Sequence, residues 1–331
     1  MLRTAVIGVG HLGRQHARIH ATLAAEGRTQ FVCVCDLNPE TAKSIAAERQ
    51  TEWTADWKSL SGKVDAVSLA VPTESHCEIA CGLLAAGIHV LVEKPISRTS
   101  AEADQMIAAA DKGGAMLQVG HLERFNPALI ALKPHVRNPV YFEIHRVGEF
   151  TARSLDIDVV LDLMIHDLDI VQWLVGAEVE VTSLHAVGIP ILTNRIDAAN
   201  ARLEFATGAV ANITASRVGT ERIRKMRFFQ PRDYIAVDYA TKRASVSSLA
   251  PPAADGAWPG VHVRNLDVLD IEPLRSEILA FIEAADADRP SPVSAAEGKQ
   301  ALVLALRVLE RIQEHAGNTQ VEAVKAQLGA P

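Results

Sequence analysis

A histidine and two acids interrupt an apolar stretch of the chain. Asp162, His166 and Asp169 are spaced i, i+4 and i+7, so on a helix over residues 159–175 they share one face. A carboxylate one turn from a histidine fixes its tautomer and raises its basicity. The spacing therefore predicts that His166 is a general base oriented by Asp162. Two alternatives stay open: a structural histidine in an acidic helix start, and a metal site made from the three side chains.

A lysine follows a short apolar strand predicted over residues 90–93. Lys94 and Pro95 come directly after it. In open α/β sheets, ligands bind at the carboxyl ends of the strands. A cation there can donate to a substrate hydroxyl and stabilise an alkoxide. We therefore predict that Lys94 binds substrate and takes part in catalysis. The alternative is an ordinary surface lysine.

The elements that must hold these groups begin at residues 4–8, a predicted strand that runs into G-x-G-x-x-G. In such a turn the first glycine allows the bend, the second lets the backbone approach a pyrophosphate, and the third lets the next helix pack on the strand. The pyrophosphate then lies on the free N–H groups of that helix. We predict a dinucleotide site that includes Gly8, Gly10, His11, Leu12 and Gly13.

Asp36 ends the second predicted strand, 23 positions after Gly13, close to the roughly 20 expected for a ribose-binding acid. Its carboxylate would repel a 2′-phosphate by about 1 to 4 kcal/mol at contact. The following Leu37 and Asn38 include no arginine to receive that phosphate. We therefore favour NAD over NADP. The alternative is that Asp36 only begins a turn.

Composition limits the class of protein. A chain of 331 residues exceeds the size at which one core keeps growing, about 250–300 residues, so we expect two domains. The formal net charge of −7 argues against general nucleic-acid binding. We see neither a signal peptide nor a run of about 20 apolar residues, and expect no membrane span. The four cysteines, Cys33, Cys35, Cys77 and Cys81, are expected to be free thiols in a reducing, cytoplasmic compartment.

Strands and helices alternate in the first third of the chain. The predicted strands cover residues 4–8, 30–35, 66–71, 90–93 and 116–120, and the predicted helices 12–25, 39–48, 75–86 and 100–111. Short, nearly all-apolar strands are typical of a parallel sheet covered on both faces. We predict a doubly wound Rossmann domain over residues 1–121.

The pattern changes over residues 122–331, where we predict an α+β domain with a large, mainly antiparallel open sheet. Strands follow one another without intervening helices, which implies antiparallel pairing. The predicted strands cover 140–147, 178–188, 196–205, 209–217, 223–229, 234–238 and 244–248. The predicted helices cover 126–132, 159–175, 274–287 and 295–315, and residues 250–260 are predicted as an exposed loop.

Taken together, the motifs resemble the Gfo/Idh/MocA oxidoreductase family over nearly the whole chain. The resemblance rests on G-x-G-x-x-G-x-x-H ending at His16, on Glu93-Lys94-Pro95, and on the D-x-x-x-H-x-x-D signature from Asp162. It implies oxidation of a sugar or cyclitol hydroxyl, with Lys94 and His166 as the catalytic pair and hydride passed to NAD. It implies a cis peptide before Pro95 and a homodimer or homotetramer. It also implies cofactor contacts by Val71, Pro72, Thr73, His76, Glu93 and Lys94.

The segment from His121 to Pro127, together with Asp162–Asp167, resembles a narrower branch of the family. Its members oxidise the 3-hydroxyl of UDP-N-acetylglucosamine, which is our best hypothesis for the substrate. Such a substrate brings a diphosphate, and guanidinium groups match phosphate oxygens. The candidate arginines are Arg124, Arg146, Arg153, Arg217, Arg222 and Arg224. For residues 222–227 the alternative is a solvated edge strand kept from pairing by positive charge.

Other functions stay open on the same residues. One is a free-sugar or inositol dehydrogenase. Another is a non-catalytic NAD-binding sensor, although a sensor has no need for Lys94, Asp162 and His166 together. A third is an enzyme that retains and recycles its NAD.

Overall fold

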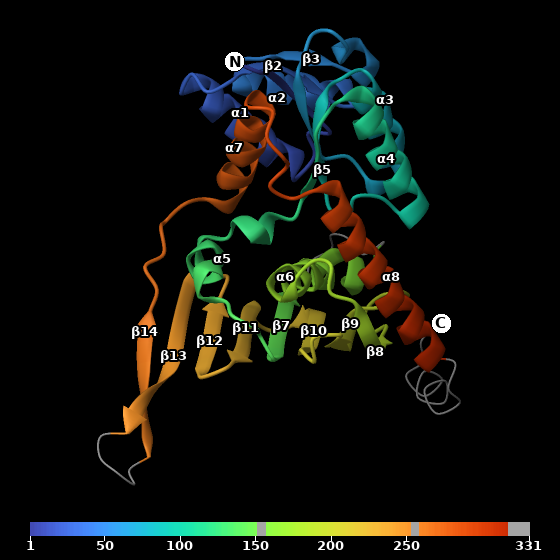
Figure 1. Cartoon of the computed structure of the whole chain (residues 1–331). Helices are drawn as coiled ribbons and strands as arrows, with labels where there is room; N and C mark the ends of the chain where they lie inside the picture. The colour runs from blue at the N-terminus through green and yellow to red at the C-terminus, as the bar shows by residue number, and fades with distance from the viewer. Residues whose placement is uncertain (151–156, 253–257, 317–331) are drawn as a thin grey trace. The chain divides into compact units, whose positions relative to one another are not determined.

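The structure is a computed structural model that describes residues 1–150, 157–252 and 258–316 (Figure 1). By its internal contacts the chain divides into two units. Unit 1 contains Met1–Phe125 and Ile271–Leu302, and unit 2 contains Asn126–Asp270 and the chain from Val303 onward. The sequence predicts one boundary, after residue 121. The structure differs in returning the chain to unit 1 at residue 271.

Unit 1 holds a parallel sheet that has six strands in the described residues, in the order β3-β2-β1-β4-β5-β6. The order reverses between β1 and β4, which is where doubly wound folds bind ligands. The Rossmann prediction is therefore confirmed. The sequence did not reveal β3, a short and mostly exposed edge strand with no apolar run. The strands are β1 Arg3–Ile7, β2 Gln30–Cys35, β3 Glu52–Thr54, β4 Ala66–Leu69, β5 His89–Glu93 and β6 Leu117–Gly120.

Helices cover both faces of this sheet, with α1, α2 and α7 on one side and α3 and α4 on the other (Figure 1). Their bounds are α1 Gly13–Ala25, α2 Pro39–Arg49, α3 His76–Ala85, α4 Ser100–Gly113 and α7 Pro273–Asp286. One core cluster explains why residue 271 onward joins this unit. Leu23 of α1, Leu91 of β5 and Phe281 of α7 are buried together in it. Apolar burial thus fixes α7 on α1 and β5.

Unit 2 holds the second sheet, with eight strands in the described residues and the order β14-β13-β12-β11-β7-β10-β9-β8 (Figure 1). The described pairs are antiparallel except β7 with β10, so the mainly antiparallel prediction is confirmed. The strands are β7 Tyr141–Glu149, β8 Val181–Ile189, β9 Ala198–Phe205, β10 Val210–Gly219, β11 Ile223–Gln230, β12 Asp233–Asp238, β13 Arg243–Pro252 and β14 Pro259–Asn265.

The loop predicted over residues 250–260 is wrong at both ends. Residues 250–252 extend β13, and Pro259 begins the edge strand β14. Proline and glycine suggested a loop, but an exposed edge strand tolerates both, because its outer N–H groups need no partner strand. Every residue of β14 is exposed.

The helix predicted over residues 159–175 is present in two parts. Val160–Met164 forms a π-helical turn, and α6 follows at Ile165–Val175. The other helices are α5 Pro127–Leu132 and α8 Ala295–Ala316, and α8 begins in unit 1 and continues into unit 2. None of the described helices is both long and apolar enough to cross a membrane.

Candidate active site

The glycine turn leaves the start of α1 open. A Cβ at residue 13 would lie 1.7 Å from the Gly8 carbonyl oxygen, so only glycine allows α1 to approach the turn this closely. A Cβ at Gly10 would meet nothing within 4 Å, which leaves a cradle for a ligand. Leu12 precedes α1 without capping it, whereas Asn38 and Thr99 cap α2 and α4. The Arg14 and Gln15 N–H groups donate to the Gly10 and Leu12 carbonyl oxygens. The open cradle at Gly10 and a helix start with no side chain capping it fit a pyrophosphate.

Asp36 lies beside this turn at the end of β2. Its Oδ2 accepts a hydrogen bond from the Val9 N–H at 2.8 Å, and its Oδ1 accepts one from the Asn38 N–H at 2.9 Å. These bonds fix the carboxylate next to the cradle, where a ribose acid must be. Its contact with ribose stays a prediction.

His76 joins the two other segments for which cofactor contacts are predicted. Its Nε2 lies 3.0 Å from the Val71 carbonyl oxygen, and its Nδ1 lies 3.1 Å from the Pro95 carbonyl oxygen. Burial lowers the pKa of His76, although these carbonyl oxygens favour its charged form. The side chain is 1% exposed and therefore acts as an internal tie between the Val71–Thr73 and Glu93–Pro95 segments.

Lys94 follows β5 and is half-buried, and its peptide bond to Pro95 is cis, as expected. The backbone N–H of Lys94 donates to Oε2 of Glu93 at 3.3 Å, while Nε2 of His16 lies 2.9 Å from the other oxygen, Oε1. Burial acts to raise the pKa of Glu93, but the His16 hydrogen bond and the charges of His16 and Lys94 hold it below its usual value. Glu93 is therefore an ionised, buried support beneath Lys94.

The three members of the predicted polar stripe lie in two kinds of helical turn and differ in exposure. Asp162 lies in the π-helical turn and His166 in the first turn of α6, and both side chains are half-buried. Asp169 is 1% exposed and belongs to the buried side of α6. The i→i+5 bonding of a π turn changes the angle between successive residues, so α-helical spacing does not carry across it. Such turns are frequent at functional sites.

The residue that anchors α6 is Asp167, which the sequence reasoning missed. Nε and Nη2 of Arg146 on β7 donate to its two oxygens at 2.7 and 2.8 Å. Arg146 is 2% exposed, and its guanidinium carbon lies 5.4 Å from the Tyr239 ring centre. Arg146 thus holds the helix of His166 against β7, and a direct contact with substrate phosphate stays a prediction. Asp167 is next to His166 in the sequence, but no sequence pattern identified Arg146 as its partner.

Asp197, which the sequence reasoning missed, and Arg217, which it named as a phosphate candidate, hold the loop after β8. Three backbone N–H groups, from residues 191–193, donate to Oδ2 of Asp197 at 2.7 to 2.9 Å. Burial acts to raise the pKa of Asp197, and these donors lower it below its usual value. Arg217 donates to the Ile157 and Ile196 carbonyl oxygens, and the Ile196 N–H donates to Asp158 at 2.8 Å. Arg217 and Asp197 therefore tie this loop to the residues that precede the π turn.

The other candidate arginines lie in different settings. Nη1 of Arg124, which is 6% exposed, lies 2.5 Å from Oε1 of Glu297. Arg222 is exposed, and Arg224 is half-buried on β11. The alternative of an edge strand is wrong, because β11 pairs with both β7 and β12. Arg153 lies outside the described residues. Phosphate contacts by these arginines stay predictions.

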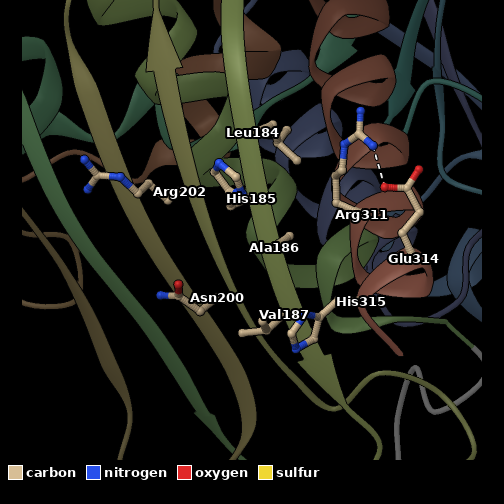
Figure 2. Close-up of a pocket in the computed structure, with 9 residues that line it drawn as sticks. All are labelled: Leu184, His185, Ala186, Val187, Asn200, Arg202, Arg311, Glu314 and His315. Carbon is tan, nitrogen blue, oxygen red and sulfur yellow. Dashed lines mark hydrogen bonds and ion pairs between the residues drawn. The ribbon is translucent and has the colours of Figure 1, made fainter. Parts of the chain in front are cut away.

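No cluster of three or more His, Cys, Asp or Glu side chains in the described residues could hold a metal ion. The metal alternative for Asp162, His166 and Asp169 therefore has no geometric support. A hollow of about 490 Å³ lies along β8, β9 and α8 (Figure 2). Its lining includes no predicted site residue, and its two arginines are paired, Arg202 with Glu204 and Arg311 with Glu314.

Comparisons with known proteins agree with this geometry. The model of an oxidoreductase family with an NAD-binding Rossmann fold matches residues 2–121, and the model of the GFO/IDH/MocA C-terminal domain matches residues 131–229. UDP-N-acetylglucosamine 3-dehydrogenase of Acidithiobacillus ferrooxidans is 38% identical, over 93% of this chain and 96% of that protein. The NAD(+)-dependent scyllo-inositol 2-dehydrogenase of Bacillus subtilis is 30% identical, over 65% of this chain and 67% of that protein.

Solved structures show the same likeness. A structure of the Acidithiobacillus ferrooxidans enzyme has a TM-score of 0.87 at 36% identity and covers 95% of this chain and 98% of its own. Levoglucosan dehydrogenase, in complex with NADH and levoglucosan, has a TM-score of 0.83 at 20% identity and covers 95% and 97%. At that identity the second likeness concerns the fold alone.

Proposed function

Because the chain belongs to the Gfo/Idh/MocA oxidoreductase family, whose members include NAD-binding sugar dehydrogenases, we propose that it oxidises the 3-hydroxyl of UDP-N-acetylglucosamine to a ketone. The observation that carries this proposal is the 38% identity to an enzyme of that activity over almost all of both chains. The Glu93-Lys94-Pro95 motif and the Asp162, His166 pair supply the residue types that such an oxidation needs.

Bound NAD supplies a hydride acceptor. Lys94 donates to the reacting hydroxyl and stabilises negative charge as it develops on that oxygen. His166 accepts the hydroxyl proton, and Asp162 orients it or holds the sugar. Arg146 keeps α6, and so His166, in position through Asp167.

We further propose that the cofactor is NAD and not NADP. Asp36 is fixed beside the glycine turn by the Val9 and Asn38 N–H groups. A carboxylate held there suits ribose hydroxyls and repels a 2′-phosphate by about 1 to 4 kcal/mol at contact. Cofactor contacts by the remaining predicted residues, Gly8, Gly10, His11, Leu12, Gly13, Val71, Pro72, Thr73, His76, Glu93 and Lys94, belong to the same proposal.

The test is a substrate screen followed by two substitutions. UDP-N-acetylglucosamine, other UDP-sugars, free sugars and inositols are offered with NAD or NADP, and nicotinamide reduction is followed. Lys94→Ala and His166→Ala should each lower kcat by about 10²- to 10⁴-fold while NADH still binds, because each removes one proton-handling group. Lys112→Ala and His262→Ala, both at exposed positions, are the matched controls. Near-normal turnover in either site variant contradicts its assigned role.

The second candidate is a free-sugar or inositol dehydrogenase. It is favoured by the 30% identity to the scyllo-inositol 2-dehydrogenase. The same screen separates the two, since turnover of inositol with no reaction of any UDP-sugar selects the second. Binding of NADH without turnover of any compound, in an otherwise folded protein, favours the sensor.

We also propose a homodimer or homotetramer in the cytoplasm. The outer face of the unit 2 sheet exposes apolar side chains, with Val187, Ile189 and Phe229 each 45–50% exposed. Light scattering after size exclusion checks the assembly, and a monomer at working concentration contradicts it.

The four cysteines are free in the structure, which suits a reducing compartment. Cell fractionation checks the location.

A further inference from the structure

Glu277 is a buried acid that the proposed mechanism does not use. It lies on α7 between Leu274 and Phe281, on the face that packs into the unit 1 core. Its side chain is 0% exposed, and neither carboxyl oxygen has a hydrogen-bond partner within the described residues. An ionised carboxylate in such a place costs several kcal/mol, and a neutral acid costs far less. Glu277 therefore keeps its proton.

A second carboxyl group explains why that proton matters. Glu93 shares one face of β5 with Leu91, and Leu91 is buried in the cluster that contains Leu274 and Phe281 on either side of Glu277. After burial, the charge of Glu93 is the second cause that raises the pKa of Glu277 well above its usual range. The pKa of Glu93 is displaced in the other direction, because His16 and Lys94 favour its charged form. Two carboxyl groups pushed apart in this way share one negative charge. The charge stays on Glu93, and the proton stays on Glu277.

Other charged groups also lie on the elements around α7. The elements that pack on it are α1, β5 and the short turn Leu122–Phe125. Their charged or titratable groups are Arg14, His16, Arg18 and His20 on α1, His89 and Glu93 on β5, and Glu123 and Arg124 on the turn. Burial and the nearby His16 lower the pKa of His20 to about 3, so His20 carries no charge near neutral pH. Among these groups, the charge of Glu93 raises the pKa of Glu277.

We propose that Glu277 is a positioning residue for Lys94 and acts through Glu93 as an acid that is neutral near neutral pH. While Glu277 is neutral, the Glu93 carboxylate stays between His16 and the Lys94 N–H. When Glu277 loses its proton to solvent at alkaline pH, two like charges face each other in a poorly solvated core. Repulsion then displaces the Glu93 carboxylate from His16 and from the Lys94 N–H, and the start of the Glu93–Pro95 segment moves with it. An effect of this displacement on turnover rests on the proposed function. The loss of the Glu277 proton at alkaline pH does not.

The first experiment measures the free energy of unfolding against pH for the full chain, wild type and Glu277→Gln. The folded pKa of Glu277 lies above its unfolded value. The contribution of Glu277 to the free energy of unfolding is thus complete below the unfolded pKa. It is lost as pH rises toward and through the folded pKa. Glutamine cannot ionise, so Glu277→Gln should gain stability relative to wild type as pH rises. Glu283→Gln removes a half-exposed carboxylate of the same helix that pairs with Arg28, and its curve should run parallel to the wild-type curve at alkaline pH. Parallel curves for Glu277→Gln and wild type overturn the proposal.

The second experiment measures NADH affinity by fluorescence over the same pH range. The wild type should lose at least about threefold more affinity than Glu277→Gln between about pH 7 and about pH 9.5. If the Glu277 side chain only filled space, wild type and Glu277→Gln would lose NADH affinity equally. If Glu277→Gln does not fold, Glu277→Met tests the same point, since it is also neutral and of similar size. Neither measurement needs a sugar substrate, so failure of the proposed reaction leaves this test intact. Equal losses in all variants reject the positioning role.

Discussion

Each unit holds one of the two side chains proposed to react, Lys94 in unit 1 and His166 in unit 2, and the units handle buried charge in opposite ways. In unit 1 the support beneath Lys94 is a carboxylate bound by His16, with a second acid, Glu277, kept neutral nearby. In unit 2 the support of α6 is a full ion pair, Arg146 with Asp167, in which both charges are buried and matched by two hydrogen bonds. A neutral acid loses its proton as pH rises, whereas an arginine keeps its charge throughout the usual pH range. On this proposal, the support beneath Lys94 in unit 1 responds to alkaline pH, whereas the support of α6 in unit 2 does not.

The second difference lies in what the sites are made of. The cofactor cradle proposed in unit 1 depends mainly on backbone groups at the start of α1, although His16, His76 and Glu93 support the segments beside it. The unit 2 site depends on side chains from separate strands and loops, such as Arg146, Asp197 and Arg217. Backbone sites depend on local sequence, and side-chain networks depend on the fold that brings them together. Three substitutions test this contrast, in order of expected size.

The largest effect is expected for Arg146→Ala, which leaves Asp167 buried without its bidentate partner. Removing one member of a buried ion pair typically costs about 3–5 kcal/mol. Urea unfolding followed by circular dichroism measures it. Arg202→Ala, which removes a half-exposed arginine paired with Glu204, is the control and should cost under about 1 kcal/mol. An Arg146→Ala cost as small as the control's would show that α6 does not depend on this pair.

A smaller effect is expected for Asp197→Asn, which weakens the acceptor of three backbone N–H groups. Hydrogen bonds to a charged group contribute about 1.5–3 kcal/mol, so we expect a loss of about 2 kcal/mol at neutral pH. The folded pKa of Asp197 lies below the ordinary value of 3.8. Its stabilisation is therefore complete above the unfolded pKa and is lost as pH falls through the folded pKa.

Hydrogen exchange of residues 190–197 measures the Asp197 effect locally. The variant and the wild type should become alike as the pH is lowered. A difference that stays constant down to acid pH would mean that the charge of Asp197 is not the cause. Together with the Glu277 titration, this measurement asks whether the two units respond at opposite ends of the pH range.

The smallest effect is expected for His76→Ala, which removes the tie between the Val71 and Pro95 carbonyl oxygens. A neutral imidazole can donate only one of these two hydrogen bonds. One hydrogen bond contributes about 0.5–1.5 kcal/mol, so NADH affinity should fall about two- to tenfold. Fluorescence titration measures it, with His262→Ala as the control. The unfolding energy of unit 2 should not change. Equal NADH affinity in His76→Ala would show that the two segments hold their positions without this tie.

Much of unit 1 could be predicted because its signals are local. The glycine turn, Asp36 and the strand before Lys94 each depend on a few adjacent residues, and apolar strands identify a covered parallel sheet. The short edge strand β3 was missed because three exposed residues carry no hydrophobic pattern. The sequence did not predict that α7 packs in unit 1, because an amphipathic pattern shows which face a helix buries but not which element covers that face.

By itself, then, the sequence determined the Rossmann order of elements, the mainly antiparallel second sheet and the residue types at the candidate site. Only the tertiary structure decided which side chains meet. The π-helical turn before His166, the Arg146–Asp167 pair and the neutral Glu277 beside Glu93 all join residues that are not neighbours in an ideal helix or strand. Periodicity and spacing describe one element at a time, while burial and charge pairing depend on several elements packed together.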